Sequence, residues 1–493
     1  MGMFEVKVSW DGTENFTGGL DDISSEVQMF RFGRGRDSEL DHAPAGKCLI
    51  SVKDTEGKYV PENTSSPLYG MLLPARPVRI RAQYGGTWYN LYFGYLDDIQ
   101  PHPIRTQNRA YLPCTDGFDQ LSRARISMPL QVNQKSGQLF ATALDRAGWS
   151  ATKRRLDSGI DVYPLVHAER QSCKGFLQKL ETSEFGFMYI GGDGYLNWED
   201  RHHRLKAPHI TSQWIAKASL YKEIDPTHSL VSVRNAVILT AQPKSKADAL
   251  TDLWKLQENK DKVPANSPLL VAGETKVYWA TFADSNGVSN IAGDVVAPVS
   301  VTDYLGNSAQ DGSGVDRTAD ITITATILAG SAKLDVKNTS ATSLYLTLLK
   351  IRGKIYTNLG ELQIESVDAT SQAKYLYRDL KVDLPYYQSA DIMQGMADYQ
   401  LSVRKEPIPG YVVSLEGGTD ELMTQLLARE LSDRITLQST KYYIDADFYI
   451  NKIDIELGED GVLRGKWTIT RAQDEEYWIL GTSALGVGTR LAY

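Results

Sequence analysis

Apolar and polar residues alternate along most of the first part of this chain. Residues 4–10 alternate strictly, and residues 78–82 and 88–93 repeat the period of two. This alternation predicts half-buried β-strands, because successive side chains of a strand point to opposite faces of a sheet. Gly85 and its neighbouring glycine lie between two of these strands, where a tight hairpin turn needs a positive φ. We therefore expect residues 1–125 to form a small β-barrel or sandwich.

The period changes in the next part of the chain. Residues 139–144 and 176–180 place apolar side chains at helical spacing. Aromatic and aliphatic residues at 187–190 and 195–198 flank a Gly-Gly-Asp-Gly turn, a pattern typical of a β-hairpin. We expect a small α/β domain over residues 126–215.

A polar passage and a β-rich segment follow. We expect residues 216–265 to hold the start of a second β-barrel and a linker, since residues 247–262 are polar, weakly helical or irregular, and end before Pro264. Residues 266–362 are rich in Thr, Ser, Val, Gly and Asp, and residues 320–327 alternate. This segment predicts an inserted β-sandwich without a helix.

The last part of the sequence begins with a helical pattern and then returns to strands. Apolar residues between 388 and 404 recur on one helical face, and Pro407 stops the helix. Residues 434–437 and 465–470 alternate like strands of a closing meander. We expect residues 363–493 to form a second β-barrel and a C-terminal tail.

These segments predict a mainly β fold with a small α/β part. With 493 residues, the chain is too long for one ordinary core, so several folding units are required. We expect two β-barrel domains of the kind that form tubes, an α/β domain between them and the inserted β-sandwich.

Charge and cysteine content narrow the classes of function. The formal net charge of −8 repels phosphate backbones, so we expect no specific nucleic-acid binding. Three cysteines without a CxxC spacing encode neither a disulfide framework nor a zinc site, which favours synthesis in a reducing compartment. The N-terminus has no signal-peptide pattern, and no apolar run approaches the roughly 20 residues of a membrane span.

Candidate metal ligands have simpler interpretations. His202 and His203, with His209 nearby, could suggest a metal, but adjacent strand residues point to opposite faces. The loops at 311–316 and 284–287 are rich in oxygen ligands and glycine, but they lack the spacing of an EF-hand, so we interpret them as turns. We predict no metal and no cofactor.

No catalytic pattern is present either. Carboxylate pairs such as Asp97-Asp98 and Glu475-Glu476 arise readily among 61 acidic residues, and the GxSxG, HExxH and Walker motifs are absent. The 26 tyrosines and nine tryptophans could line a sugar-binding groove, although cores and subunit interfaces are the more common use of aromatic residues. The sequence therefore predicts no catalytic residue and no enzyme.

Two parts of the chain resemble a known family. Residues 30–41 (FRFGRGRDSELD), followed by Ala45-Gly46, SPLYG at 66–70, PARP at 74–77 and FGYLD at 93–97, resemble the N-terminal barrel of bacteriophage minor tail or baseplate hub proteins. Residues 371–377, the helix after Ser389 and the terminal residues 478–493 are similar to the C-terminal part of such chains. The resemblance brackets nearly the whole sequence and covers residues 266–362 less securely.

The resemblance implies a structural protein of the virion, in the tail tip or baseplate, made in the cytoplasm of the host bacterium. It implies a homotrimeric ring whose six barrels match the sixfold tail tube and whose channel lets DNA pass during ejection. The implied partners are the distal tail or tube protein above, a tip fibre or spike protein below and the tape measure protein. A trimer would carry a formal charge of about −24, three times that of one chain, which would let DNA slide without sticking.

Residues 30–41 and the last dozen residues are the predicted subunit or tube contacts. Their Gly-Arg-Gly and Gly-Val-Gly segments allow backbones to approach closely, and arginine is enriched at interfaces. The predicted interface residues are Phe32, Arg34, Arg36, Asp41, Trp478, Leu485, Arg490 and Tyr493.

Two alternatives stay open from the sequence. The 266–362 sandwich could bind a glycan on the host surface, and this function could coexist with a structural one. A tail-associated cell-wall hydrolase is the other alternative, which the missing catalytic motifs weaken.

Overall fold

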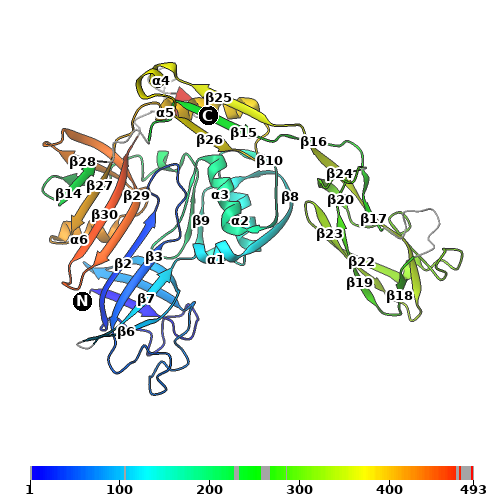
Figure 1. The fold of residues 1–493 in the computed structure, drawn as a ribbon, viewed down its shortest axis with the longest axis horizontal. Coiled ribbons are helices and arrows are strands. Elements are labelled where there is room, and N and C mark those ends of the chain that lie inside the picture. Colours follow the sequence, from blue (N-terminus) through cyan, green and yellow to red (C-terminus); the bar gives the residue numbers. More distant parts are fainter. Residues whose placement is uncertain are drawn as a thin grey trace.

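The computed structural model describes residues 3–104, 107–226, 232–256, 267–284 and 286–472, together with two short strands near the C-terminus. Strands make up 46% of the chain and helices 16%, which confirms a mainly β fold. None of the helices in these ranges is long and apolar enough to cross a membrane. In Figure 1 the chain forms a body of several packed units and an arm that extends from one side.

The N-terminal residues form the first β unit, and the predicted strands at 4–10, 78–82 and 88–93 are confirmed. Its strands pair in the order β1-β4-β5-β7-β3-β2, with β6 on β7. Alternating apolar side chains such as Val6, Val8 and Phe30 face its core. The strands are β1 (Phe4–Val8), β2 (Val27–Gly35), β3 (Lys47–Lys53), β4 (Pro77–Tyr84), β5 (Thr87–Leu96), β6 (Gln100–Ile104) and β7 (Gln107–Thr115).

The α/β unit follows, and its predicted helices and hairpin are confirmed. Phe140 on α2 stacks on Trp198 of β12 with ring centroids 4.2 Å apart, so the helix pattern and the hairpin share one core. The elements are α1 (Phe118–Arg123), β8 (Arg125–Lys135), α2 (Ser136–Arg146), β9 (Arg154–Leu156), β10 (Val162–Ser172), α3 (Cys173–Glu184), β11 (Phe187–Ile190) and β12 (Leu196–Glu199).

The second β unit collects strands from two distant parts of the sequence. Its strands pair in the order β13-β28-β29-β30-β27-β14, and α6 (Asp420–Ala428) packs beside them. The strands are β13 (Ile215–Lys217), β14 (Glu223–Pro226), β27 (Gly410–Glu416), β28 (Arg434–Ser439), β29 (Ile444–Leu457) and β30 (Leu463–Arg471).

Strands β2 and β29 join the two β units into one 13-stranded sheet. The first half of β29 pairs with β28, and its second half pairs with β2 from Phe30↔Leu457 to Gly35↔Lys452. Closed barrels were expected, but the ladders of the described residues end at edge strands and do not close. The edge strands β13 and β14 are separated in the sequence only by residues 218–222, and the backbone before β2 bonds to β1 through Val8 N–H to Asp21 O.

A small third sheet was not foreseen as a unit of its own. Strand β15 (Ala236–Ala241) lies between β25 (Leu362–Val367) and β26 (Asp379–Asp383), with α4 (Ala369–Tyr375) and α5 (Ala390–Arg404) beside them. The predicted helix over 388–404 is confirmed as α5. The sequence divided these strands between a linker and the second barrel because β15 pairs with partners more than a hundred residues away.

The inserted sandwich is present, but its predicted start at residue 266 is wrong. Strands β16 and β17 pair with β24, so they belong to the insert and not to a linker, and 251–255 is strand where an irregular passage was expected. We call residues 242–361 the arm, as far as they are described. Its strands are β16 (Lys244–Lys246), β17 (Thr251–Lys255), β18 (Leu269–Leu270), β19 (Thr275–Thr281), β20 (Ile291–Val296), β21 (Tyr304–Asn307), β22 (Ile321–Ile327), β23 (Ser331–Asn338) and β24 (Leu344–Asn358).

One more expectation for the arm needs correction. No helix was expected inside it, yet a 3₁₀ turn spans Thr318–Asp320 and leads into β22. Thr318 N–H donates to the Asp316 carboxylate at 2.8 Å, a local bond that favours such a turn.

Candidate functional site

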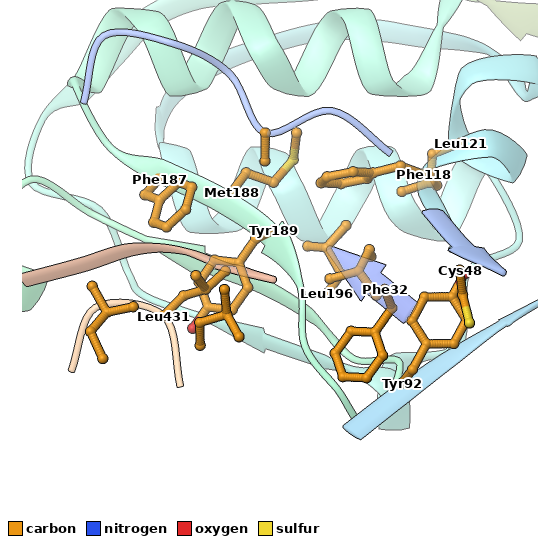
Figure 2. Packing of buried hydrophobic residues seen from close by; sticks show 14 of the residues in the cluster. Phe32, Cys48, Tyr92, Phe118, Leu121, Phe187, Met188, Tyr189, Leu196 and Leu431 are labelled. Atoms are coloured by element: carbon orange, nitrogen blue, oxygen red, sulfur yellow. The ribbon is translucent and has the colours of Figure 1, made fainter. Parts of the chain in front are cut away.

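Strand β2, which carries the first predicted interface residues, lies where the units of the body meet. Phe32 is 4% exposed, and its ring centroid is 5.7 Å from that of Tyr92 on β5. Figure 2 shows Phe32 beside Tyr92, with Phe187 and Tyr189 of β11 in the same packed region. Because these side chains come from the first β unit and the α/β unit, β2 holds the two units together.

The Gly-Arg-Gly segment brings two strands together within this chain. Gly35 has a φ of +101°, and a Cβ added there would lie 2.2 Å from the Asn451 carbonyl oxygen of β29. A Cβ on Gly33 would lie equally close to the Asp454 carboxylate. Between these glycines, Arg34 is 8% exposed and forms an ion pair with Glu430 of the second β unit.

Arg36 occupies the centre of the junction. It donates a hydrogen bond to the Gly186 carbonyl at 3.2 Å, and its guanidinium lies 4.0 Å from the centroid of the Phe187 ring. Burial, with a smaller effect of the nearby Arg204, lowers the pKa of Arg36 to about 10, although three neighbouring carboxylates act in the opposite direction. The side chain therefore stays charged at neutral pH, and the neighbouring carboxylates stabilise this buried positive charge.

Glu39 ties further elements to this centre. Its carboxylate accepts hydrogen bonds from Arg204 at 3.3 Å and from Arg404, at the end of α5, at 3.4 Å. Burial would raise the pKa of Glu39, but the surrounding arginines outweigh it and hold the pKa below its ordinary value. Arg204 also donates to the Asn451 side chain at 2.7 Å, which reaches the second β unit. We call Arg34, Arg36, Glu39, Arg204, Arg404 and Glu430 the charged junction.

A histidine cluster continues the junction between the α/β unit and the second β unit. His203 Nδ1 lies 2.8 Å from the Asp157 carboxylate, and its ring is 4.9 Å from that of His209. Burial opposes protonation of His203, but Asp157 and Glu199 outweigh it and raise its pKa. Among the residues that the structure describes, no group of three or more His, Cys, Asp or Glu side chains could hold a metal ion.

A cleft of about 1000 Å³ opens beside the charged junction, between the loop after β2, helix α3 and the small third sheet. On its wall, His42 Nδ1 lies 2.5 Å from the buried Glu181 carboxylate, and His42 Nε2 lies 3.2 Å from the Thr182 hydroxyl. Asp41 is exposed at the rim of this cleft. These contacts attach the loop to α3.

The predicted interface residues fall into four groups. Phe32, Arg34 and Arg36 are buried inside the chain, whereas Asp41 is exposed. Trp478 and Arg490 belong to the paired strands β31 (Tyr477–Trp478) and β32 (Arg490–Leu491). Leu485 and Tyr493 lie outside the described residues. A contact of any of these residues with another subunit stays a prediction.

Sequence reasoning missed the partners of β2. Glu39, Arg204 and Arg404 are separated from one another by at least 165 residues, as the Arg204–Glu39 bond illustrates. The sequence carries a partial signal, because Arg404 stands in the last turn of a predicted helix and Glu39 lies in the segment that resembles hub proteins. Neither signal says which charges meet.

Comparisons with known proteins identify the fold. No protein-family model and no curated protein matches the sequence. The structure is similar to the 43 kDa tail protein of prophage MuSo2 from Shewanella oneidensis, with a TM-score of 0.51 and 11% identity over 95% of this chain and 98% of that chain. It is also similar to a tail protein from Neisseria meningitidis MC58, with a TM-score of 0.51 and 10% identity over 96% and 97% of the two chains. The chain therefore has the fold of phage tail proteins, as its sequence resemblance implied.

Proposed function

We propose that this chain is a structural protein of a phage tail tip, located in the virion, where it forms the hub ring of the baseplate. The observation that carries the proposal is the end-to-end similarity of its fold to that of a prophage tail protein, over 95% of one chain and 98% of the other. Since a fold alone does not establish function, the exposed surfaces of the chain must also suit a ring.

The edge strands of the body support assembly. In the described part of the chain, β14 pairs only with β27, and β13 only with β28, so each has one side without a neighbouring strand. An edge strand can accept a strand from another subunit, which completes the sheet and prevents random aggregation. Ile215 on β13 is 44% exposed, which adds an apolar contact at this edge.

An exposed aromatic turn offers a second contact. Tyr442 and Tyr443, between β28 and β29, are 53% and 96% exposed. Tyr443 also has a φ of +53°, a conformation that a bulky side chain adopts at a cost. Tyrosine is enriched at protein interfaces, so this turn suits a contact with a neighbouring tail protein.

In the proposed ring, three copies contribute six β units, which matches the sixfold symmetry of a tail tube. The ring joins the distal tail or tube protein above to a threefold spike or fibre below, and the tape measure protein and DNA pass through its channel. The charged junction supports this role because it fixes the units of each copy relative to one another. We propose no catalytic role, since the junction side chains are engaged in contacts between units.

The native mass of the purified full chain tests the proposal. Light scattering should give a mass near three times 54.8 kDa, and negative-stain images should show a ring. A stable monomer at every concentration, also in the presence of purified tail-tube protein, would contradict it.

A further inference from the structure

A groove of about 800 Å³ lies between the arm and the body. Its body side includes Ser127, Glu169 and Arg170 from β8 and β10, and its arm side includes Trp279 of β19 and Ser331 of β23. The Ser331 hydroxyl donates to the Glu169 carboxylate at 3.2 Å, so the arm touches the body at one end of the groove. This volume is within the roughly 300–1000 Å³ of small-ligand sites.

The body side of the groove has an irregular backbone. The pairing of β10 with β8 shifts register between Val166 and Ala168 and again between Ala168 and Gln171. Within this bulge, Arg170 has a φ of +46°, and its N–H donates to the Ser127 hydroxyl at 3.2 Å. Bulges redirect side chains and occur often at functional sites, where strained backbone is retained. Here the bulge places Glu169 and Arg170 in the groove, and both are exposed.

The arm side presents an exposed tryptophan. Trp279 is 57% exposed, and it lies opposite Lys333 in the pairing of β19 with β23. Val277, two residues earlier on the same face of β19, is 50% exposed. A large aromatic side chain left in solvent at the wall of a groove offers a flat apolar face to a ligand.

The remaining groups of the groove are hydrogen-bond donors and acceptors. Lys244 Nζ donates to the Asn358 side chain at 3.1 Å, and both residues line the groove. The Asn358 amide, the Ser331 hydroxyl and the two charged residues of the bulge supply donors and acceptors around the aromatic face. Positive and negative groups are mixed, which does not favour a polyanion.

We infer that this groove binds a neutral oligosaccharide. A sugar ring presents C–H groups on its faces and hydroxyl groups at its rim, which matches one aromatic face surrounded by amide, hydroxyl, carboxylate and guanidinium groups. Trp279 stacks on a sugar ring, while Glu169 and Arg170 bind its hydroxyls. The site is independent of ring assembly, because one chain supplies all its residues.

The test applies the full chain to an array of immobilised neutral oligosaccharides from bacterial O-antigens and capsules, followed by affinity measurement on the retained glycan. Trp279→Ala should weaken binding at least about tenfold, as expected for a central aromatic contact. The matched control is Trp88→Ala, because Trp88 is 44% exposed on β5 and does not line the groove. This control should bind like the unmodified chain.

Arg170→Gly separates binding from stability. Glycine adopts a positive φ without strain, so the variant should be at least as thermostable as the unmodified chain and yet lose affinity about tenfold or more. Three results would overturn the inference: no glycan retained by the unmodified chain, equal affinities for Trp279→Ala and Trp88→Ala, or capture of a second copy of the chain in the groove in place of any glycan.

Discussion

The body and the arm are stabilised in different ways. One continuous apolar core runs through both β units, the α/β unit and the small third sheet, and its strands come from distant parts of the sequence. The arm has a separate core, made only by residues between 253 and 355. Buried and half-buried charges with partners far away in the sequence connect the units of the body, whereas the strands of the arm pair among themselves.

The point of insertion explains this difference. Ala241 at the end of β15 pairs with Leu362 at the start of β25, so the two ends of the arm leave the body side by side. In Figure 1 the arm extends from this place, away from the two β units. Insertions into such a hairpin connection leave the core undisturbed, because few contacts cross the boundary. The body and the arm can therefore present separate surfaces within one chain.

The largest effect should come from removing the arm. Residues 242–361 can be replaced by an Asn-Gly turn because Ala241 and Leu362 already pair. The shortened chain should fold and should assemble with the same number of copies as the full chain. Glycan retention should be lost completely. Circular dichroism, light scattering and the glycan array measure these outcomes, and an insoluble or unfolded product would show that the arm and the body fold as one unit.

Core truncations should separate the unfolding of the two regions. Leu334 in the arm and Leu437 in the body are both fully buried, and replacing either by alanine should cost about 3 kcal/mol. Calorimetry of the full chain should show a lowered arm transition for Leu334→Ala and a lowered body transition for Leu437→Ala. One shared transition, lowered equally by both variants, would refute independent cores.

Loss of one residue of the charged junction should lower the free energy of unfolding of the body somewhat less than the core truncations do. Arg204→Met should destabilise the body by about 2 kcal/mol, because Glu39 and Asn451 lose a donor in a region of low solvent access. Arg123→Met is the matched control, since Arg123 pairs with Asp119 on an exposed helix surface and should change stability by less than about 0.5 kcal/mol. Urea unfolding measures both variants. Equal effects would show that the charged junction does not stabilise the packing of the units of the body.

The smallest effect concerns Glu184 at the end of α3. Burial raises the pKa of its carboxyl group from 4.5 to about 7, so the folded chain binds the proton more tightly than the unfolded chain does. Protonation of Glu184 therefore increases the free energy of unfolding as pH falls from about 7 to 4.5. Glu184→Gln should therefore be more stable than the unmodified chain by about 1 kcal/mol at pH 8, and this advantage should shrink as pH falls.

Urea unfolding at pH 8, 6.5 and 5 measures this pH dependence. The matched control is Glu62→Gln, because Glu62 is exposed. A difference between Glu184→Gln and the unmodified chain that does not change with pH would show that Glu184 keeps an ordinary pKa.

Sequence reasoning was reliable where the signal was local. The period of two in residues 4–10 and 88–93 predicted β1 and β5, and the helical spacing at 139–144 predicted α2, because each pattern reports the burial of neighbouring side chains. The start of the arm was misplaced because β16 is polar and its sequence, Lys-Ser-Lys, gives no apolar alternation. Only its pairing with β24 defines it as part of the arm.

The candidate site shows the same limit. Sequence resemblance selected residues 30–41 but not their role inside the chain, where Arg34 meets Glu430 and Arg36 meets Gly186. Such pairs join residues 150 or more positions apart, and their choice depends on how the units pack. No local pattern contains that information.

Two-dimensional class averages of the assembled protein, with and without the arm, would show whether the body alone builds the ring. We expect threefold rings whose three peripheral projections disappear when residues 242–361 are removed, while the ring itself is unchanged. Rings that fail to form without the arm, or particles of the full chain without threefold symmetry, would contradict this expectation.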